Sequence, residues 1–142
     1  MLKVAINGFG RIGRTAFKVI QDKYTDQIEV VGINDLTDSR TLAHLLKYDS
    51  NYGVLDKEIK AKENSILVSG KEYKVFAKAD PLKLPWKKLG IDIVLECTGF
   101  FTDYNSAKSH IKAGAKKVIV SAPCKSKEMP SFVLGVNEDK YD

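Results

Sequence analysis

Short apolar runs alternate with segments of helical periodicity over the first third of the chain. Residues 2–7 form an apolar run that predicts a buried strand, and residues 28–33 predict a second one. Between them, from Arg11 onward, apolar side chains recur at spacings of three and four, which predicts a helix. The apolar residues of that helix are Ile12, Ala16, Phe17, Val19 and Ile20. A second helix, capped by Asp38 or Ser39, is expected to bury Leu42, Leu45 and Leu46.

The middle of the chain alternates polar and apolar residues, as half-exposed strands do. Three segments show this alternation, over residues 58–62, 65–68 and 71–76. Ser69 and Gly70 lie between the last two segments and predict a hairpin turn. Pro81 and Pro85 then interrupt the regular structure.

The last third returns to alternating strands and helices. Residues 91–96 and 117–121 predict buried strands, and residues 102–113 predict a helix that stops at Gly114. Residues 132–136 predict the last strand. Strands that alternate with helices are typical of a parallel sheet built from β-α-β units, so the expected fold class is α/β. The alternating segment over 58–76 adds an inserted antiparallel hairpin segment to this sheet.

The composition is that of a single globular domain. The 142 residues are 44% hydrophobic and 29% charged, which argues against disorder and is enough for one core. We therefore expect one domain, residues 1–142. No segment approaches the roughly 20 consecutive apolar residues of a membrane span, so no membrane partner is expected.

The net charge of +5 would attract any polyanion, but it is not concentrated. The lysines are scattered and no arginine-rich tract is present, so no dedicated nucleic-acid role is expected. Cys97 and Cys124 lie far apart and outside any metal-binding spacing. We therefore expect no metal site, no disulfide framework and a reducing, cytoplasmic location.

A glycine-rich turn carries the main candidate chemistry. Gly8, Gly10 and Gly13 match the pattern G-x-G-x-x-G between the first predicted strand and helix. Asp35 follows the second predicted strand, 22 residues past Gly13. Together these features predict a Rossmann-type, doubly wound and mostly parallel sheet that binds a dinucleotide.

Each part of the turn has its own expected role. Gly8 permits the tight turn, Gly10 lets a pyrophosphate approach the backbone, and Gly13 lets the helix pack closely on the sheet. The N–H groups of Arg11 and Ile12 are expected to face the phosphates at the positive end of the helix dipole. The Arg11 side chain adds a formal charge nearby.

Asp35 favours NAD over NADP. A carboxylate at this place accepts hydrogen bonds from the ribose hydroxyls and would repel a 2′-phosphate. Arg40 is the nearest basic residue that follows it. The alternative role for Asp35 is a simple helix cap.

Several blocks of the chain resemble the glyceraldehyde-3-phosphate dehydrogenase family. The first block is Asn-Gly-Phe-Gly-Arg-Ile-Gly-Arg over residues 7–14. Further blocks lie at residues 33–36, 46–50, 96–101, 114–123 and 135–137. The likeness covers the whole chain, and several blocks are specific to this family rather than to nucleotide binding in general.

The resemblance implies NAD as the cofactor and extends the candidate site beyond the glycine turn. It implies that Thr98 and Gly99 lie in a loop beside the dinucleotide, and that Ser121 and Ala122 lie at the next strand end, near the nicotinamide. The full set of cofactor-binding candidates is Asn7, Gly8, Phe9, Gly10, Arg11, Ile12, Gly13, Asp35, Thr98, Gly99 and Ser121.

Three positions depart from the family's pattern. Ala79, with Lys78 beside it, stands where the family often carries an Arg that flanks the adenine. Cys97 replaces a Ser or Ala and is expected to be buried and inert, and Cys124 replaces a small residue. Neither cysteine matches the family's catalytic position.

The resemblance implies that the catalytic residues lie outside this chain. In the family, the nucleophilic Cys follows shortly after the region of residues 137–141, and the base His belongs to a later catalytic domain, absent from this chain. His44 and His110 are both expected on the surface of helices. No catalytic residue is therefore assigned, and the chain alone is expected to be inactive.

For the complete protein, the resemblance implies the oxidation of glyceraldehyde 3-phosphate to 1,3-bisphosphoglycerate, with NAD and inorganic phosphate, through a cysteine thioester. The phosphorylated aldehyde would bind only with the missing catalytic domain. The family forms homotetramers, and apolar surface left without its C-terminal helix would favour self-association.

Two alternatives stay open. An erythrose-4-phosphate dehydrogenase would look similar over these residues, because the aldehyde is recognised mainly by absent ones. A free-standing, non-catalytic module that binds NAD or nucleic acid is the other alternative.

Overall fold

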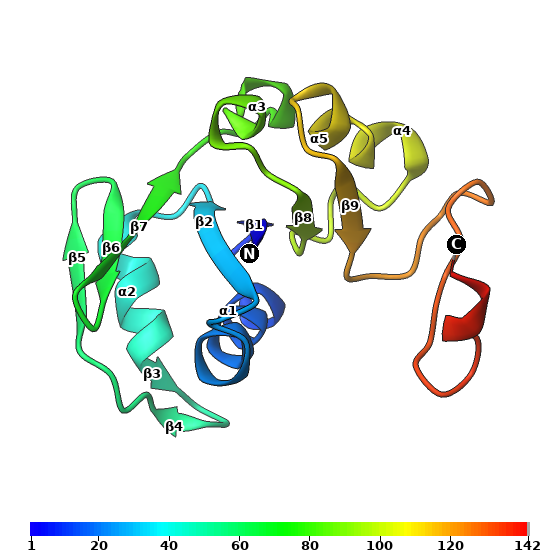
Figure 1. Ribbon diagram of the computed structural model, residues 1–142. Helices are drawn as coiled ribbons and strands as arrows, with labels where there is room; N and C mark the ends of the chain where they lie inside the picture. Colours follow the sequence, from blue (N-terminus) through cyan, green and yellow to red (C-terminus); the bar gives the residue numbers. More distant parts are fainter. Residues whose placement is uncertain (142) are drawn as a thin grey trace.

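A seven-stranded sheet forms the centre of the computed structural model, which describes residues 1–141 (Figure 1). The strand order is β5-β6-β7-β2-β1-β8-β9. Neighbours from β7 to β9 pair in parallel, whereas β5, β6 and β7 pair antiparallel. The strands are β1 (Leu2–Asn7), β2 (Ile28–Asn34), β5 (Ile59–Lys62), β6 (Ser65–Val68), β7 (Lys71–Phe76), β8 (Ile93–Glu96) and β9 (Lys117–Val120). The predicted fold class, a mostly parallel sheet with an inserted antiparallel hairpin, is confirmed.

Helices cover both faces of this sheet (Figure 1). The α-helices are α1 (Arg11–Lys23), α2 (Ser39–Lys47), α3 (Trp86–Leu89), α4 (Tyr104–Ala107) and α5 (Ser109–Lys112). Two 3₁₀ turns, η1 (Pro81–Lys83) and η2 (Glu138–Lys140), and a small ribbon of β3 (Tyr48–Asp49) and β4 (Gly53–Val54) complete the elements. No helix within the described residues is both long enough and apolar enough to span a bilayer.

Alternate residues of the central strands pack into two separate cores. On one face, Ile6 and Ile33 pack with Phe17 of α1 and Leu42 of α2. On the other face, Ala5 and Val94 belong to a cluster with Trp86 of α3. This division is the expected result of a parallel sheet whose strands are buried on both sides.

The predicted hairpin turn is confirmed at Ser69 and Gly70. Both residues have positive φ, 48° and 84°, which suits a two-residue turn that follows the twist of the strands. Val68 and Lys71 pair directly across it. Because β7 also pairs in parallel with β2, the hairpin extends the main sheet.

The sequence patterns misplaced several side chains of the helices. Leu45 was expected to be buried but is 36% exposed, and Ile12 and Val19, part of the apolar pattern of α1, are 55% and 43% exposed. Arg14 of α1 and Ala43 of α2 are buried instead. The predicted single helix over residues 102–113 is divided into α4 and α5.

The prediction of a last strand over residues 132–136 is wrong. The backbone turns there, with Val136 N–H donating to the Val133 carbonyl at 3.0 Å and Val133 N–H to Asn137 Oδ1 at 2.7 Å. Leu134 is 88% exposed, and the segment leaves the sheet after β9 (Figure 1). An apolar run forms a strand only where a neighbouring strand accepts its hydrogen bonds, and β9 pairs only with β8 within residues 1–141. As an edge strand, β9 is also half-exposed rather than buried.

Candidate functional site

A cleft of about 420 Å³ opens where β1, β2 and β8 end. The carboxyl ends of parallel strands are where open α/β sheets bind their ligands, so this is the place that the sequence predicted. Of the predicted site residues, five line the cleft: Asn7, Gly8, Gly10, Asp35 and Thr98.

Gly8 joins β1 to the turn because no other residue fits there. Its φ is +88°, and a Cβ at this position would lie 2.8 Å from the backbone nitrogen of Thr98. The turn after β1 and the turn after β8 are therefore in backbone contact. Its own N–H donates to the Asn34 carbonyl at 2.8 Å, which ties it to the end of β2 as well.

The N-terminus of α1 faces the cleft without a cap. Gly10 occupies the N-cap position, no side chain accepts from the first turn, and that turn holds no acidic residue. Its first N–H groups, including those of Arg11 and Ile12, lack partners within the helix, and the helix dipole adds positive potential. A Cβ on Gly10 would meet nothing within 4 Å. This combination suits a phosphate held against the backbone.

The Arg11 side chain does not add its charge to this place. Its guanidinium pairs with Asp49, Nη1 to Oδ1 at 2.9 Å, and lies over the Tyr52 ring at 5.9 Å. Asp49 also pairs with Lys18 at 3.2 Å. Arg11 therefore contributes only its backbone N–H, beside that of Ile12, as a candidate phosphate donor.

The pKa of the Asp49 carboxyl lies well below its usual value, chiefly because the Asn51 N–H donates to it and further because of Arg11, the Tyr52 N–H and Lys18. The charged form is thus stabilised by folding. That stability is present above the ordinary aspartate pKa and is lost as the pH falls through the lower, folded-state value.

We expect Asp49→Asn to be less stable than wild type at pH 7, with the difference in the free energy of unfolding shrinking below about pH 4. Urea denaturation across this range measures it. The exposed Asp26→Asn serves as the control, and a difference independent of pH would contradict the prediction.

Asp35 holds the glycine turn as well as facing the cleft. Its Oδ2 accepts from the Phe9 N–H at 2.8 Å and its Oδ1 from the Thr37 N–H at 2.9 Å. The cap of α2 is Asp38, which accepts from the Thr41 N–H at 2.9 Å. The alternative role of Asp35 as a helix cap is therefore excluded, and its partly exposed carboxylate stays available to a ligand.

Two predicted contact residues point their side chains into the protein. Phe9 is fully buried and packs edge-to-face on Phe17, with ring centroids 5.6 Å apart. Its backbone is held from both sides, because its carbonyl accepts from Arg14 Nη1 at 2.9 Å. Asn7 is 1% exposed and hydrogen-bonds inside the sheet. These residues support the turn from beneath.

The predicted residues after β8 and β9 are only partly brought together. Thr98 lines the cleft, whereas Gly99 and Ser121 do not. Ile12 of α1 is not among the lining residues either. Ser121 is exposed beyond the end of β9. Cys97, expected to be buried, is only half-buried and lines the cleft, although burial still raises the pKa of its thiol.

The apolar walls of the cleft escaped the sequence analysis. Leu36, Phe100 and Phe101 line it, although Leu36 and Phe100 are 68% and 84% exposed. Lys78 and Ala79, singled out in the sequence as a departure from the family's pattern, line it as well. Large exposed apolar side chains next to a conspicuous acid and a glycine turn were the signal that could have identified them.

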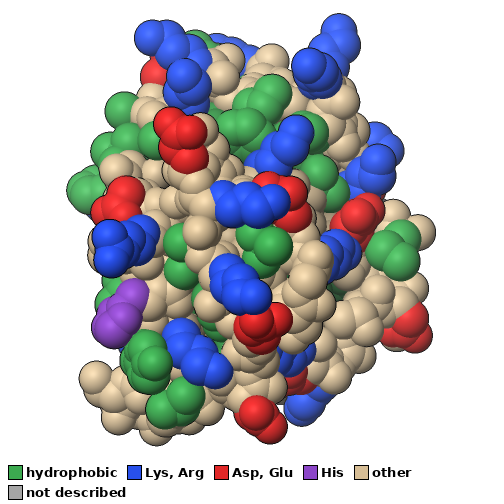
Figure 2. Space-filling model, turned by 90° about the vertical axis from the view of Figure 1, so that its left-hand side faces the viewer, with side chains coloured by type: hydrophobic (Ala, Val, Ile, Leu, Met, Phe, Trp, Pro, Cys, Tyr) green, Lys and Arg blue, Asp and Glu red, His purple; other side chains and the backbone are tan. Residues whose placement is uncertain are grey.

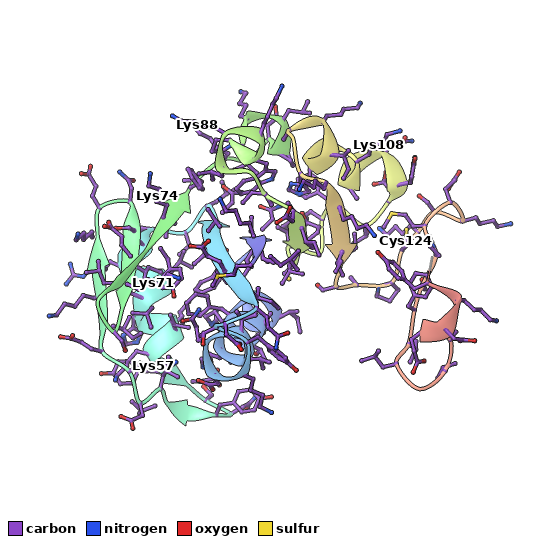
Figure 3. The ribbon with its side chains drawn as sticks, viewed as in Figure 1. Lys57, Lys71, Lys74, Lys88, Lys108 and Cys124 are labelled. Carbon is purple, nitrogen blue, oxygen red and sulfur yellow. The ribbon has the colours of Figure 1, made fainter. Side chains whose placement is uncertain are left out.

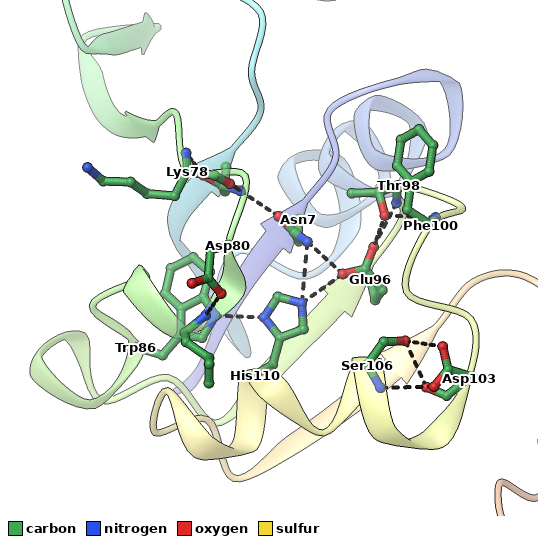
Figure 4. A network of polar contacts seen from close by, with 12 residues as sticks. Asn7, Lys78, Asp80, Trp86, Glu96, Thr98, Phe100, Asp103, Ser106 and His110 are labelled. Carbon is green, nitrogen blue, oxygen red and sulfur yellow. Dashed lines mark hydrogen bonds and ion pairs between the residues drawn. The ribbon is translucent and has the colours of Figure 1, made fainter.

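The prediction that His110 lies on the surface is wrong. It is fully buried, with Nε2 at 2.7 Å from Glu96 Oε2 and Nδ1 at 3.0 Å from Trp86 Nε1 (Figure 4). His110 has polar neighbours along α5, so its own helix gave no sign of burial. The side chain that covers it, Trp86, comes from a segment 24 residues away. His44, in contrast, is exposed as expected.

A larger hollow of about 750 Å³ lies between α2 and β5. Arg40, Lys47 and Lys62 are among its lining residues, but Lys47 Nζ is already bonded to the carbonyls of Leu55 and Lys57, both at 2.8 Å. None of its lining residues lies at the end of β1, β2 or β8, so we favour the smaller cleft as the functional site.

The positive charge is dispersed over the molecule. Figure 2 shows Lys and Arg side chains interspersed with Asp and Glu on the face that it presents. The labelled lysines of Figure 3 project outward from several parts of the chain, and only Lys71 and Lys74 share an element, β7. No group of three or more His, Cys, Asp or Glu side chains among residues 1–141 is placed to hold a metal ion.

Comparison with known proteins shows which sequences this chain resembles. Residues 2–104 match the sequence model of a family described as glyceraldehyde 3-phosphate dehydrogenase, NAD binding domain. The chain is 56% identical over 142 residues to glyceraldehyde-3-phosphate dehydrogenase of Clostridium pasteurianum, which covers 100% of this chain and 42% of that protein. It is 54% identical over 140 residues to the Thermotoga maritima protein of that name, covering 99% and 42% of the two chains. The chain thus spans about two fifths of the length of the curated relatives that it matches.

Proposed function

The chain belongs to the glyceraldehyde 3-phosphate dehydrogenase family as its NAD-binding domain, and from this premise we propose that the cleft at the ends of β1, β2 and β8 is where it binds NAD. NAD is the cofactor of this domain family. The uncapped N-terminus of α1, with the open space at Gly10, is the observation that carries the placement. It leaves room and N–H donors for a diphosphate.

The other walls of the cleft suit the remaining parts of the cofactor. The Asp35 carboxylate offers acceptors to ribose hydroxyls. Leu36 and Phe100 offer apolar surface to a flat aromatic base, a common arrangement in nucleotide pockets. When bound, NAD supplies hydride transfer, and this domain supplies its position.

For the complete protein we propose the oxidation of glyceraldehyde 3-phosphate with NAD and inorganic phosphate. The names of the relatives support this activity. Neither cysteine of this chain is assigned as the nucleophile, and the thiol of Cys97 is disfavoured because burial raises its pKa. In this proposal the acyl-transfer residues lie in the part of the relatives that this chain does not cover.

Calorimetric titration of the chain with NAD and with NADP tests the binding proposal. We expect saturable NAD binding and a clear preference over NADP. In Asp35→Asn, a neutral amide replaces the carboxylate, so NAD binding should weaken by about 1.5–3 kcal/mol, the range for a hydrogen bond to a charged group. The difference between the affinities for NAD and NADP should become smaller, because the repulsion of a 2′-phosphate disappears.

Asp38→Asn is the matched control, because Asp38 caps α2 outside the lining of the cleft and asparagine caps equally well. It should leave both affinities unchanged. An Asp35→Asn variant with the wild-type ratio of NAD to NADP affinity would refute the role given to Asp35.

A further inference from the structure

A buried chain of polar side chains runs beneath the cleft (Figure 4). Asn34, Asn7 and Glu96 are register neighbours at the ends of β2, β1 and β8. They are 5%, 1% and 1% exposed, and His110 beside them is 0% exposed. The mechanism proposed above uses none of their side chains, yet such burial of polar groups is costly unless each is hydrogen-bonded.

The direction of the hydrogen bonds is fixed at one end by a backbone amide. The Lys78 N–H donates to Asn34 Oδ1 at 2.9 Å, which identifies the oxygen of that amide. Asn34 Nδ2 therefore donates to Asn7 Oδ1, at 2.7 Å. Asn7 Nδ2 is then left to donate to Glu96 Oε2, at 2.6 Å. Each step follows because an amide has one donor end and one acceptor end.

The other end is fixed by an indole. Trp86 Nε1 can only donate, so His110 Nδ1, 3.0 Å away, must accept. The proton of a neutral ring then lies on Nε2, which donates to Glu96 Oε2 at 2.7 Å. Asn7 Nδ2 also lies 3.3 Å from His110 Nε2, but both nitrogens then carry the protons that Glu96 accepts. The donors on both sides of Glu96 thus point toward its carboxylate.

The second oxygen of Glu96 holds the turn that borders the cleft. Its Oε1 accepts from the Thr98 N–H at 2.9 Å and from the Thr98 hydroxyl. The same hydroxyl oxygen accepts from the Phe100 N–H at 3.1 Å. Glu96 therefore accepts from four donors, and two of them belong to the turn in backbone contact with Gly8.

We propose that Glu96 and His110 are positioning residues for the dinucleotide: they hold the ends of β1, β2 and β8 and the Thr98 turn at the spacing that the cofactor requires. The inference rests on the proposed NAD binding. Neither side chain lines the cleft, so both act through Asn7, Thr98 and the glycine turn. Supporting hydrogen bonds of this kind fix the groups that contact a ligand.

The first test needs no cofactor. Nitrogen-15 NMR of the imidazole at neutral pH should show His110 with a protonated Nε2 and an unprotonated Nδ1. In Trp86→Phe the indole donor is lost while an aromatic ring remains, so the nitrogen-15 shift of Nδ1 should change as its hydrogen bond disappears, while Nε2 keeps its proton because Glu96 still accepts it. A wild-type ring protonated at Nδ1 would overturn the direction of the chain and with it the inference.

The second test compares two glutamates. Glu96→Gln introduces an N–H₂ group that faces donors, so NAD affinity should fall by about tenfold, the lower end of losses known for supporting residues in metal sites. Glu72→Gln is the control, because Glu72 also accepts from a buried hydroxyl, Ser65 Oγ at 2.6 Å, but at the β6–β7 hairpin. It should bind NAD as wild type does.

The outcomes separate the two proposals. Absence of NAD binding by the folded wild-type chain would refute the proposed function, whereas wild-type affinity in a folded Glu96→Gln would refute only the positioning role. Circular dichroism establishes the fold of each variant. If Glu96→Gln does not fold, Trp86→Phe is the deciding variant. Its NAD affinity should fall about threefold, the effect of losing one neutral hydrogen bond. An unchanged affinity would refute the positioning role.

Discussion

Gly13→Ala is expected to destabilise the domain by at least about 3 kcal/mol, a loss that few single substitutions cause. A Cβ at this position would lie 2.1 Å from the Gly8 carbonyl oxygen and 3.1 Å from the Ile6 side chain. The closer atom belongs to the backbone, so α1 would have to move away from β1. Urea denaturation followed by circular dichroism measures the loss.

Gly10→Ala is the matched control for Gly13→Ala, since it adds the same methyl group within the same turn. Nothing lies within 4 Å of its Cβ position, and the cost of alanine at an N-cap is less than about 1 kcal/mol relative to glycine. Equal stability of Gly13→Ala and Gly10→Ala would contradict the packing role of Gly13.

The same Gly10→Ala variant should lose NAD affinity by tenfold or more, about 1.4 kcal/mol. Gly10 lines the cleft, and its missing Cβ leaves the space in which the proposed diphosphate approaches the N–H groups of α1. Calorimetry with NAD measures the loss in a variant that is otherwise folded.

A thermal-shift assay gives an independent measurement for Gly10→Ala. NAD should raise the melting temperature of the wild type and raise that of the variant much less at the same concentration, because stabilisation by a ligand depends on its affinity. Undiminished affinity in Gly10→Ala would place the diphosphate elsewhere.

The parts of the fold that sequence reasoning predicted are those in which local pattern and tertiary context agree. The strand ending at Asn7, the glycine turn and the helix from Arg11 were found because apolar periodicity and turn chemistry point to the same answer. The strand expected over residues 132–136 failed because pairing is not a local property. An apolar run there has no neighbour, and the chain turns instead.

The site was predictable only for groups whose role depends on the backbone or on charge. Gly8, Gly10 and Asp35 lie where the fingerprint placed them. The burial of His110 depends on Trp86, 24 residues away, and on β8, so its own helix gave no signal. Arg11 was assigned to the phosphate by proximity in sequence, but Asp49 from beyond α2 holds it elsewhere.

The floor of the cleft is assembled from distant parts of the chain, and this bears on how the protein is made. Asn7 and Glu96 are 89 residues apart, and Asn7 and His110 are 103 apart. Closing such loops costs chain entropy, and folding slows as contacts become less local. During synthesis, Asn7 Nδ2 has no acceptor in this network until Glu96 has emerged from the ribosome, and Glu96 lacks one of its donors until His110 has followed. We therefore expect that the nascent domain completes this floor only after synthesis has passed His110.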